Sequence, residues 1–167
     1  APAAVAAQPA APAAVVPAKQ AAAESETVIE NDLYRITFTN RGAQVKSWIL
    51  KRYLDQPGGK PLELVHPVAA AKYGYPLSLW TYNPDLNAKL NSVLYVASAT
   101  GAQVAPLSIT FEYSDGSLIV RKTYSFDHSY VIRCDASVSD RGSPVRAFPA
   151  WPAGFGDATA LPAYASQ

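Results

Sequence analysis

The sequence predicts an all-β fold, a sandwich of two packed sheets, over most of its 167 residues. Three observations lead to this prediction. Apolar and polar residues alternate with a period of two in several stretches after residue 26, which is typical of half-buried strands. The pair Asp115-Gly116 separates two such alternating runs, and Asp-Gly is a strong hairpin signal. No stretch after residue 26 shows helical periodicity over a useful length, so the sequence predicts no helix of substantial length there.

The first 25 residues are predicted to form a disordered linker. Residues 1–23 consist almost entirely of Ala, Pro and Val, and four prolines interrupt any long helix. A tract of this kind behaves as a semi-extended spacer. We therefore divide the chain into a linker at 1–25 and a β-sandwich domain at 26–167.

The first strand pair is predicted on either side of the turn at Arg41-Gly42. Before the turn, Tyr34, Ile36 and Phe38 fall on one face of a strand, and polar residues fall on the other. Gly42 supplies the positive φ that a tight reversal needs. The second strand covers residues 43–50, and shorter candidate strands follow at 60–67, 75–84 and 91–100.

A three-stranded meander is the clearest unit of the sequence. Its first strand leads up to the Asp115-Gly116 turn, its second strand covers 118–126, and its third covers 130–138. Both connections are short and polar, as expected of hairpins. After residue 140 the chain is rich in Pro and Gly, so we expect no regular element longer than a few residues there.

Composition excludes some classes of function. The net charge is +1, and no basic stripe is present of the kind that binding to nucleic acid requires. No run of about 18 apolar residues is present that could span a membrane. The single cysteine, Cys134, has the even spacing of an inward-facing strand position, which predicts a small buried apolar residue.

The sequence assigns no catalytic, cofactor-binding or metal-ligating residue. His66 and His128 are the only histidines, and both are interpreted as solvated surface residues. Glu63 lies three positions before His66, but the two do not define a site, and the histidine spacing is not that of a zinc site. The Gly-rich stretch at 154–157 follows no strand and precedes no helix, so it is not predicted to bind phosphate.

The aromatic residues leave two interpretations open. They can fill the core and edges of a β-sandwich, which we prefer, or they can line a groove for a sugar or a peptide. The residues concerned are Trp48, Tyr53, Tyr73, Tyr75, Trp80, Tyr82 and Trp151.

Three blocks of the sequence resemble a known family. The stretch "ETVIENDLYRITFTNRGAQVKSWILKRYLDQPGGKPLELV" resembles the start of the periplasmic domain of the YidC-type membrane protein insertases. The stretch "SDGSLIVRKTYSFDHSYVIRCDASVSD" and the Gly-Pro-rich run at 151–156 agree with later parts of that domain. The positions that match are Asn40, Gly42, Ala43, Val45, Leu50, Lys51, Tyr53, Leu62, Leu64, Val65, Gly116, Leu118, Val120, Lys122, Tyr124, Phe126 and Tyr130.

The resemblance implies a more specific fold and location. The family's domain is a β-supersandwich related to galactose mutarotase, and this chain would end part-way through it. The Ala/Pro tract would be the linker that follows a first transmembrane helix. The domain would face the periplasm from the bacterial inner membrane, to which helices outside this chain would attach it.

The resemblance also implies a function. Proteins of this family insert and help fold inner-membrane proteins, alone or with the Sec translocon and its SecD/SecF accessory subunits. The implied partners are therefore nascent inner-membrane proteins and the translocon. No enzymatic activity, cofactor or nucleic acid is implied.

A different function on a related fold stays as the alternative, namely an aldose epimerase-like or carbohydrate-binding β-sandwich. Epimerases also carry a Gly-Ala strand near their start, which "NRGAQVKSW" would fit. They need a His and a Glu that face one sugar ring. Here His128 lacks the Asn that precedes the histidine in those enzymes, which favours the insertase interpretation.

Overall fold

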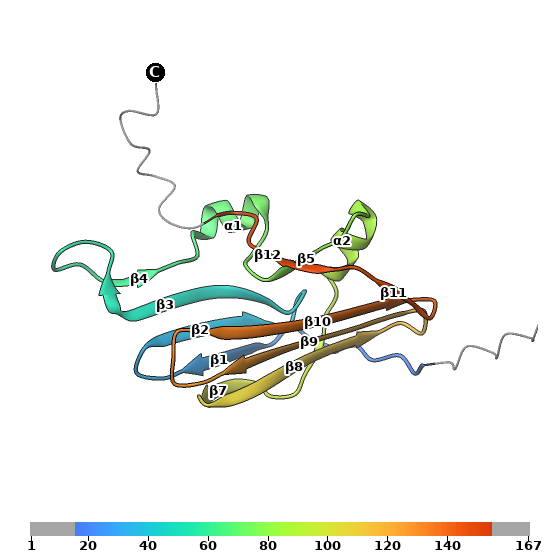
Figure 1. The fold of residues 1–167 in the computed structure, drawn as a ribbon, viewed down its shortest axis with the longest axis horizontal. Helices are drawn as coiled ribbons and strands as arrows, with labels where there is room; N and C mark the ends of the chain where they lie inside the picture. Colours follow the sequence, from blue (N-terminus) through green and yellow to red (C-terminus); the bar gives the residue numbers. More distant parts are fainter. Residues whose placement is uncertain (1–15, 155–167) are drawn as a thin grey trace, which may run out of the picture.

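The computed structural model describes residues 16–154 and contains two five-stranded sheets and one two-stranded sheet. The two large sheets overlap in Figure 1, and both helices lie together with the small sheet along one long side of them. The predicted all-β sandwich is therefore confirmed. The larger supersandwich implied by the family resemblance stays a prediction.

The first large sheet, sheet I, is built around the predicted strand pair. β2 and β3 run antiparallel on either side of the turn at residues 40–43, and β1 pairs with β2 on the other side. β7 adds to β1 in parallel at the edge. In spatial order, sheet I consists of β4 (Pro61–Glu63), β3 (Gln44–Leu54), β2 (Tyr34–Thr39), β1 (Glu26–Glu30) and β7 (Gly101–Val104).

The second large sheet, sheet II, contains the predicted meander. β8, β9 and β10 are consecutive antiparallel neighbours, which confirms the three-stranded unit. Their residues alternate between the buried core and the outer face of the sandwich. In spatial order, sheet II consists of β11 (Ser143–Val145), β10 (Ile132–Asp140), β9 (Leu118–Phe126), β8 (Leu107–Ser114) and β6 (Val96–Ala97).

Aromatic side chains join the two large sheets. Phe38 of sheet I lies with its ring centroid 4.8 Å from that of Tyr124 and 6.0 Å from that of Phe111, both of sheet II. Phe126 meets the same ring edge-on at 5.9 Å. All four side chains are buried. Such aromatic contacts add to the free energy of burying large apolar surfaces, so this cluster stabilises the packing of the sheets.

Two short helices correct the prediction that residues 26–140 contain only β structure, although neither is long. They are α1 (Pro67–Tyr73) and α2 (Pro84–Leu90). Each begins with Pro directly after a capping residue, and proline is favoured at the first position of a helix. In the sequence these prolines end the candidate strands at 60–67 and 75–84, and two turns of helix are too short to show a clear period.

The helices shorten the strands predicted around them. The candidate strand at 75–84 contains only β5 (Ser78–Trp80), and the candidate at 91–100 contains only β6. β5 pairs with β12 (Phe148–Ala150) to form the small sheet. The Pro- and Gly-rich region after residue 140 thus supplies two strands of three residues each, within the length that we expected.

Two predicted turns have the expected backbone. Gly42 has a φ of 66° in the turn between β2 and β3, and Gly116 has a φ of 95° between β8 and β9. Asp115 donates its backbone N–H to the carbonyl of Leu118 and closes the second turn. A positive φ at the first central residue alone defines a type II′ hairpin, for which glycine is the preferred residue.

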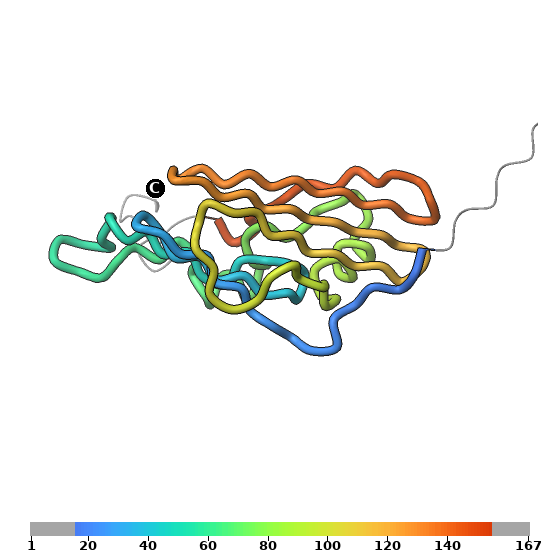
Figure 2. The backbone as a smooth tube through the Cα atoms, turned by 90° about the horizontal axis from the view of Figure 1, so that it is seen from below, coloured from blue at the N-terminus to red at the C-terminus, as the bar shows by residue number. Residues whose placement is uncertain are grey.

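The end of the predicted linker lies against the sandwich. Residues 16–25, which we call the N-terminal strap, run from the end of β8 towards β1 (Figure 2). Lys19 forms an antiparallel bridge with Ser114, and Ala21 donates its N–H to the carbonyl of Leu94 at 3.1 Å. The disorder expected for this part of the linker is thus not what the structure shows. The expectation for residues 1–15 lies outside the described residues.

Candidate functional site

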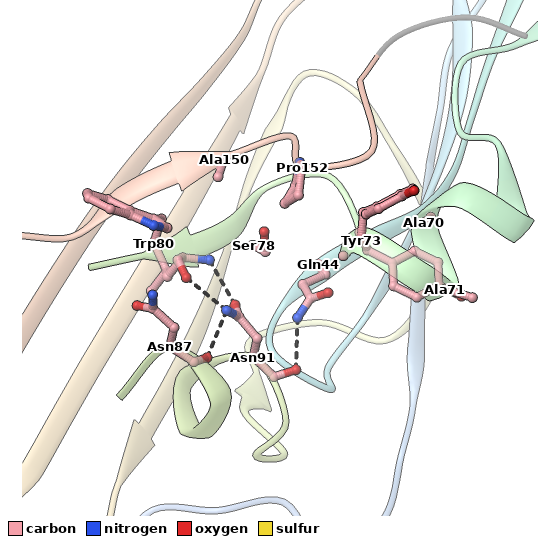
Figure 3. Close-up of a pocket in the computed structure, with 13 residues that line it drawn as sticks. Gln44, Ala70, Ala71, Tyr73, Ser78, Trp80, Asn87, Asn91, Ala150 and Pro152 are labelled. Atoms are coloured by element: carbon pink, nitrogen blue, oxygen red, sulfur yellow. Dashed lines mark hydrogen bonds between the residues drawn. The ribbon is translucent and has the colours of Figure 1, made fainter. Parts of the chain in front are cut away.

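A hollow of about 390 Å³ lies between α1, α2 and the small sheet. Figure 3 shows Tyr73 of α1, Trp80 of β5 and Ala150 of β12 around it, with Asn87 of α2 and Asn91, the C-cap of α2, on another side. Most of its lining is apolar. Pockets of this size and composition are typical of sites that contact other molecules.

Side chains at the helix starts position the walls of this hollow. The Nδ1 atom of His66 accepts a hydrogen bond from the N–H of Ala69 and so caps α1. The Oδ1 atom of Asn83 accepts from the N–H groups of Asp85 and Leu86 and caps α2. Capping matters here because a helix of two turns has few internal hydrogen bonds of its own.

Two asparagines, Asn87 of α2 and its C-cap Asn91, form hydrogen bonds with the backbone of β5 and of the residue after it, as a neighbouring strand would. Asn91 accepts a hydrogen bond from the N–H of Leu79 and donates one to its carbonyl, both at 2.8 Å. Asn87 makes the same pair of contacts with Thr81, at 2.6 and 3.0 Å. The two side chains are four residues apart, so they lie on one face of the helix. Sequence reasoning missed this pair, and the signal was the spacing of the two asparagines in "PDLNAKLN".

Three exposed aromatic residues form a cluster beside the hollow, which we call the aromatic rim. Trp80 and Tyr82 meet edge-on with ring centroids 4.6 Å apart, and Phe148 of β12 lies 6.2 Å from Trp80. Their exposed fractions are 44%, 76% and 46%. Clustered apolar side chains on a surface mark places where proteins contact partners.

The other aromatic residues singled out from the sequence do not join this cluster. Trp48 stacks on Trp151 at 5.6 Å, and Tyr53 meets Tyr130 at 5.8 Å at a different place. Tyr75 lies partly buried against the core. The aromatic residues singled out from the sequence therefore divide between two roles. Trp48, Tyr75 and Trp151 pack against the core, and Tyr73, Tyr75 and Trp80 line the hollow.

Two of the three polar residues considered for catalysis, His66 and Glu63, have structural partners. His66 caps α1, as described above. Glu63 accepts hydrogen bonds from the backbone N–H groups of Trp48 and Val65, at 2.7 and 3.0 Å. His128 lies exposed in the turn between β9 and β10. Of the Gly-rich stretch at 154–157, only Gly154 is among the described residues.

Cys134 lies on the inner side of β10 and is half-buried rather than fully buried. It is a free thiol. Burial raises its pKa, which holds the sulfur in its protonated form at neutral pH. The predicted inward orientation of Cys134 is thus confirmed. Its predicted full burial is not, because β10 is only partly covered by the rest of the protein.

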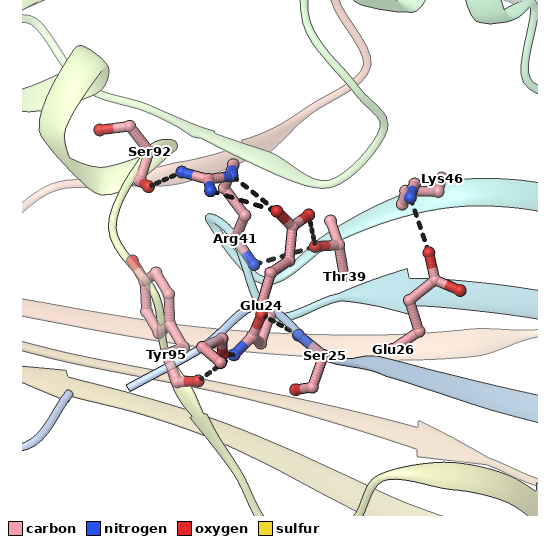
Figure 4. A network of polar contacts seen from close by, with 10 residues as sticks. Glu24, Ser25, Glu26, Thr39, Arg41, Lys46, Ser92 and Tyr95 are labelled. Atoms are coloured by element: carbon pink, nitrogen blue, oxygen red, sulfur yellow. Dashed lines mark hydrogen bonds and ion pairs between the residues drawn. The ribbon is translucent and has the colours of Figure 1, made fainter. Parts of the chain in front are cut away.

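A polar network surrounds the turn between β2 and β3 (Figure 4). Glu24 accepts hydrogen bonds from Thr39 and from two nitrogens of Arg41. These contacts lower the pKa of Glu24, the hydrogen bond from Thr39 most of all. Arg41 also donates to the carbonyl of Ser92 at 3.1 Å. The network joins the N-terminal strap, the turn and the connection after α2 in one cluster.

Residues 16–154 contain neither a metal-binding cluster nor a membrane-spanning helix. No group of three or more His, Cys, Asp or Glu side chains in this range could hold a metal ion. Neither helix in the same range has the length and apolar composition needed to cross a bilayer.

Fold and site together describe a β-sandwich module with an aromatic-rimmed hollow on one side. The family model of the YidC periplasmic domain matches residues 26–150, which is well over half of the chain. The chain therefore belongs to the YidC periplasmic domain family. This places the domain on the periplasmic side of the bacterial inner membrane and confirms the resemblance noted in the sequence.

Three curated relatives carry the name membrane protein insertase YidC. The protein of Geotalea uraniireducens (strain Rf4) is 29% identical over 103 residues, which is 60% of this chain and 19% of the relative. That of Geobacter sp. (strain M21) is 31% identical over 107 residues, 63% of this chain and 20% of the relative. That of Geobacter sulfurreducens is 32% identical over 118 residues, which is 66% of this chain and 21% of the relative. The match thus spans about a fifth of the length of these relatives.

Proposed function

We propose that this chain is the extracytoplasmic domain of a membrane protein insertase, which inserts and helps fold inner-membrane proteins. The proposal includes action alone or together with the Sec translocon, with SecD/SecF as accessory partners. Its attachment to the membrane would be through helices outside this chain. The observation that carries it is the family match over residues 26–150.

The geometry of the domain is consistent with contact between proteins. The amide groups of Asn87 and Asn91 are engaged with β5, so the hollow presents mainly apolar and aromatic surface. The aromatic rim lies open beside it. His66 and Glu63 are engaged with backbone groups, and His128, the histidine weighed for the epimerase alternative, lies exposed in the turn between β9 and β10. No observation favours the carbohydrate alternative over the insertase.

Complementation tests the proposed activity. The full-length protein that carries this domain would be expressed in a bacterium depleted of its own insertase, and insertion of a reporter inner-membrane protein would be followed by protease protection. We expect insertion to be restored. Failure of insertion at a normal level of the full-length protein would contradict the proposal, as would turnover of glucose or galactose by the purified chain.

Photo-crosslinking tests the proposed partners. A photoreactive amino acid at Tyr82 in the aromatic rim would be compared with one at Val104 on β7. The two positions are matched in exposure, at 76% and 77%. We expect crosslinks to SecD, SecF or nascent inner-membrane proteins from the first position and not from the second. The absence of such crosslinks from both positions would argue against the proposed Sec partners.

A further inference from the structure

A lysine lies fully buried between the two large sheets. Lys122 projects inwards from β9 and has no exposed surface. Its Nζ atom donates hydrogen bonds to the carbonyls of Gly42 at 3.0 Å, Ala43 at 2.7 Å and Leu77 at 2.6 Å. None of the ion pairs found in the described part of the chain involves this lysine. A buried ammonium without a carboxylate depends on such acceptors for its stability.

All three acceptor residues have a left-handed backbone. Their φ values are 66° for Gly42, 47° for Ala43 and 60° for Leu77. Within residues 16–154, only one other non-glycine residue, Arg141, has a positive φ. Residues with a Cβ rarely adopt this conformation, and it persists only where the surroundings enforce it. Here the same ammonium contacts the carbonyls of two such residues, Ala43 and Leu77, and that of Gly42.

The strained residues lead directly into the lining of the hollow. Gln44 follows Ala43, and Ser78 follows Leu77, and both of these following residues line the hollow. The N–H of Val45 donates to the carbonyl of Pro76 at 3.0 Å, which ties the two segments together. The backbone of the floor of the hollow therefore depends on the peptide units that Lys122 contacts.

We propose that Lys122 is a positioning residue whose ammonium group holds three left-handed peptide units and thereby sets the shape of the aromatic-rimmed hollow. The stoichiometry supports this role. An ammonium has three N–H donors for the three carbonyls, whereas a neutral amine has two. Deprotonation of Lys122 would therefore release one of the three carbonyls. The backbone at residues 42–43 or the backbone at residue 77 would then be held less firmly.

The surroundings of Lys122 bring its deprotonation into the pH range near neutrality. Burial lowers the pKa of Lys122 to about 7. The titratable groups that face it are Tyr124 on β9 and Cys134 on β10, and the Tyr124 hydroxyl donates to the carbonyl of Ala43 at 2.8 Å. Burial raises the pKa of both of these groups, so they stay neutral while the lysine titrates.

NMR of the intact chain tests the proposal directly. In the uniformly ¹⁵N- and ¹³C-labelled chain, the Nζ signal of Lys122 would be followed from pH 5 to pH 10 together with the amides of Val45, Ser78 and Leu79. At low pH we expect a slowly exchanging ammonium with three-bond couplings to the carbonyls of residues 42, 43 and 77. We expect the three amides to shift with the same midpoint as Nζ. A freely exchanging signal, or amides that do not follow the lysine, would overturn the proposal.

A variant tests the same point by a second route. Lys122→Met keeps the length and removes the donors, and Lys46→Met is the matched control because Lys46 is an exposed lysine paired with Glu26. We expect amide exchange at Val45, Ser78 and Leu79 to accelerate by about tenfold or more in the first variant, relative to amides of β8 to β10.

Uniform acceleration over all amides would show a merely structural role and overturn the proposal. No acceleration at the three amides would overturn it as well. If the Met variant does not fold, the titration of the unaltered chain decides between the outcomes.

Discussion

At the scale of single residues, Gly116 shows how one backbone angle limits the sequence. Its φ of 95° disfavours any residue with a Cβ, while an added Cβ would meet its nearest atom, the carbonyl oxygen of Val16, only at 3.9 Å. The cost of substitution therefore comes from the backbone and not from a clash. We expect Gly116→Val to lower the free energy of unfolding by about 1–3 kcal/mol.

Urea denaturation of the intact chain measures this effect. Ser137→Val is the control, because it places the same side chain at an exposed position of β10 where no positive φ is involved. The control should change the free energy of unfolding by less than about 0.5 kcal/mol. Equal stability of the two variants would show that the hairpin does not depend on glycine.

Lys122 makes stability depend on pH with a definite sign. Its pKa is about 7 in the folded protein and 10.5 in the unfolded reference, so the unfolded state binds more protons between these values. The stability of the folded protein should therefore rise with pH from about 7 upwards, by at most about 1.4 kcal/mol per pH unit.

The measurement is the difference in the free energy of unfolding between the natural chain and Lys122→Met, at pH 6, 7.5 and 9. Taking the difference removes contributions from groups that both proteins share, such as Cys134 and the buried tyrosines. We expect the natural chain to gain on the variant as the pH rises. A flat difference, or one with the opposite slope, would contradict the lowered pKa.

At the scale of elements, hydrogen bonds from Asn87 of α2 and from its C-cap Asn91 join the helix to β5 and the residue after it. Asn91 satisfies both backbone groups of Leu79, a residue that is only 1% exposed. Asn91→Ala would leave a buried N–H and a buried carbonyl without partners, and such groups are costly. We expect it to lower the free energy of unfolding by about 2 kcal/mol.

The control for this prediction is Ser92→Ala, the next residue along the chain. The Ser92 hydroxyl makes one exposed hydrogen bond, to the carbonyl of Lys89, so its loss should cost less than about 0.5 kcal/mol. Amide exchange at Leu79 should accelerate in the first variant alone. Unchanged exchange at Leu79 would mean that the strand edge is held by something other than Asn91.

The meander of β8, β9 and β10 could be predicted from sequence because apolar and polar residues alternate along its strands, with Lys122 as the exception in β9, and because its turn contains Asp-Gly. The two helices could not be predicted from periodicity, because each has only seven residues. Their local signals were His66-Pro67 and Asn83-Pro84, a capping residue followed by Pro at the first helical position.

The hollow could not be predicted from the sequence because it depends on contacts between distant segments. Trp80 and Phe148 are far apart in sequence and meet only because β5 pairs with β12. Lys122 was noted for its match to the family, and its alternation with Val120 and Tyr124 places it inwards. What makes that position acceptable to a lysine is the set of carbonyls from residues 42, 43 and 77, which no local pattern shows.

At the scale of the whole molecule, the N-terminal strap connects the two large sheets. Lys19 bridges to Ser114 at the end of β8 in sheet II and pairs with Glu112 of the same strand. At its other end the strap meets Asn40, next to β2 of sheet I. The family model begins only at residue 26, so this contact lies outside the matched region.

The importance of the strap follows from its hydrogen bonds with Asn40, a residue that is 1% exposed. The Asn40 side chain accepts from the N–H of Ser25 at 2.8 Å and donates to the carbonyl of Ala23 at 3.0 Å, while its backbone N–H donates to the carbonyl of Ser25 at 3.0 Å. A chain that begins at residue 26 loses these partners and leaves buried polar groups of Asn40 unsatisfied. We expect it to be less stable than a chain that begins at residue 16 by about 2–4 kcal/mol.

Urea unfolding of the two shortened chains and the full chain tests this role of the strap. The chain from residue 16 should match the full chain, because every strap contact described above is retained in it. Lys19→Ala in the full chain is the control for the exposed ion pair, which should contribute less than about 1 kcal/mol. The loss in the chain from residue 26 should therefore exceed that of the control. If the chain from residue 26 is as stable as the full chain, the strap only rests on the sandwich and the fold begins at β1.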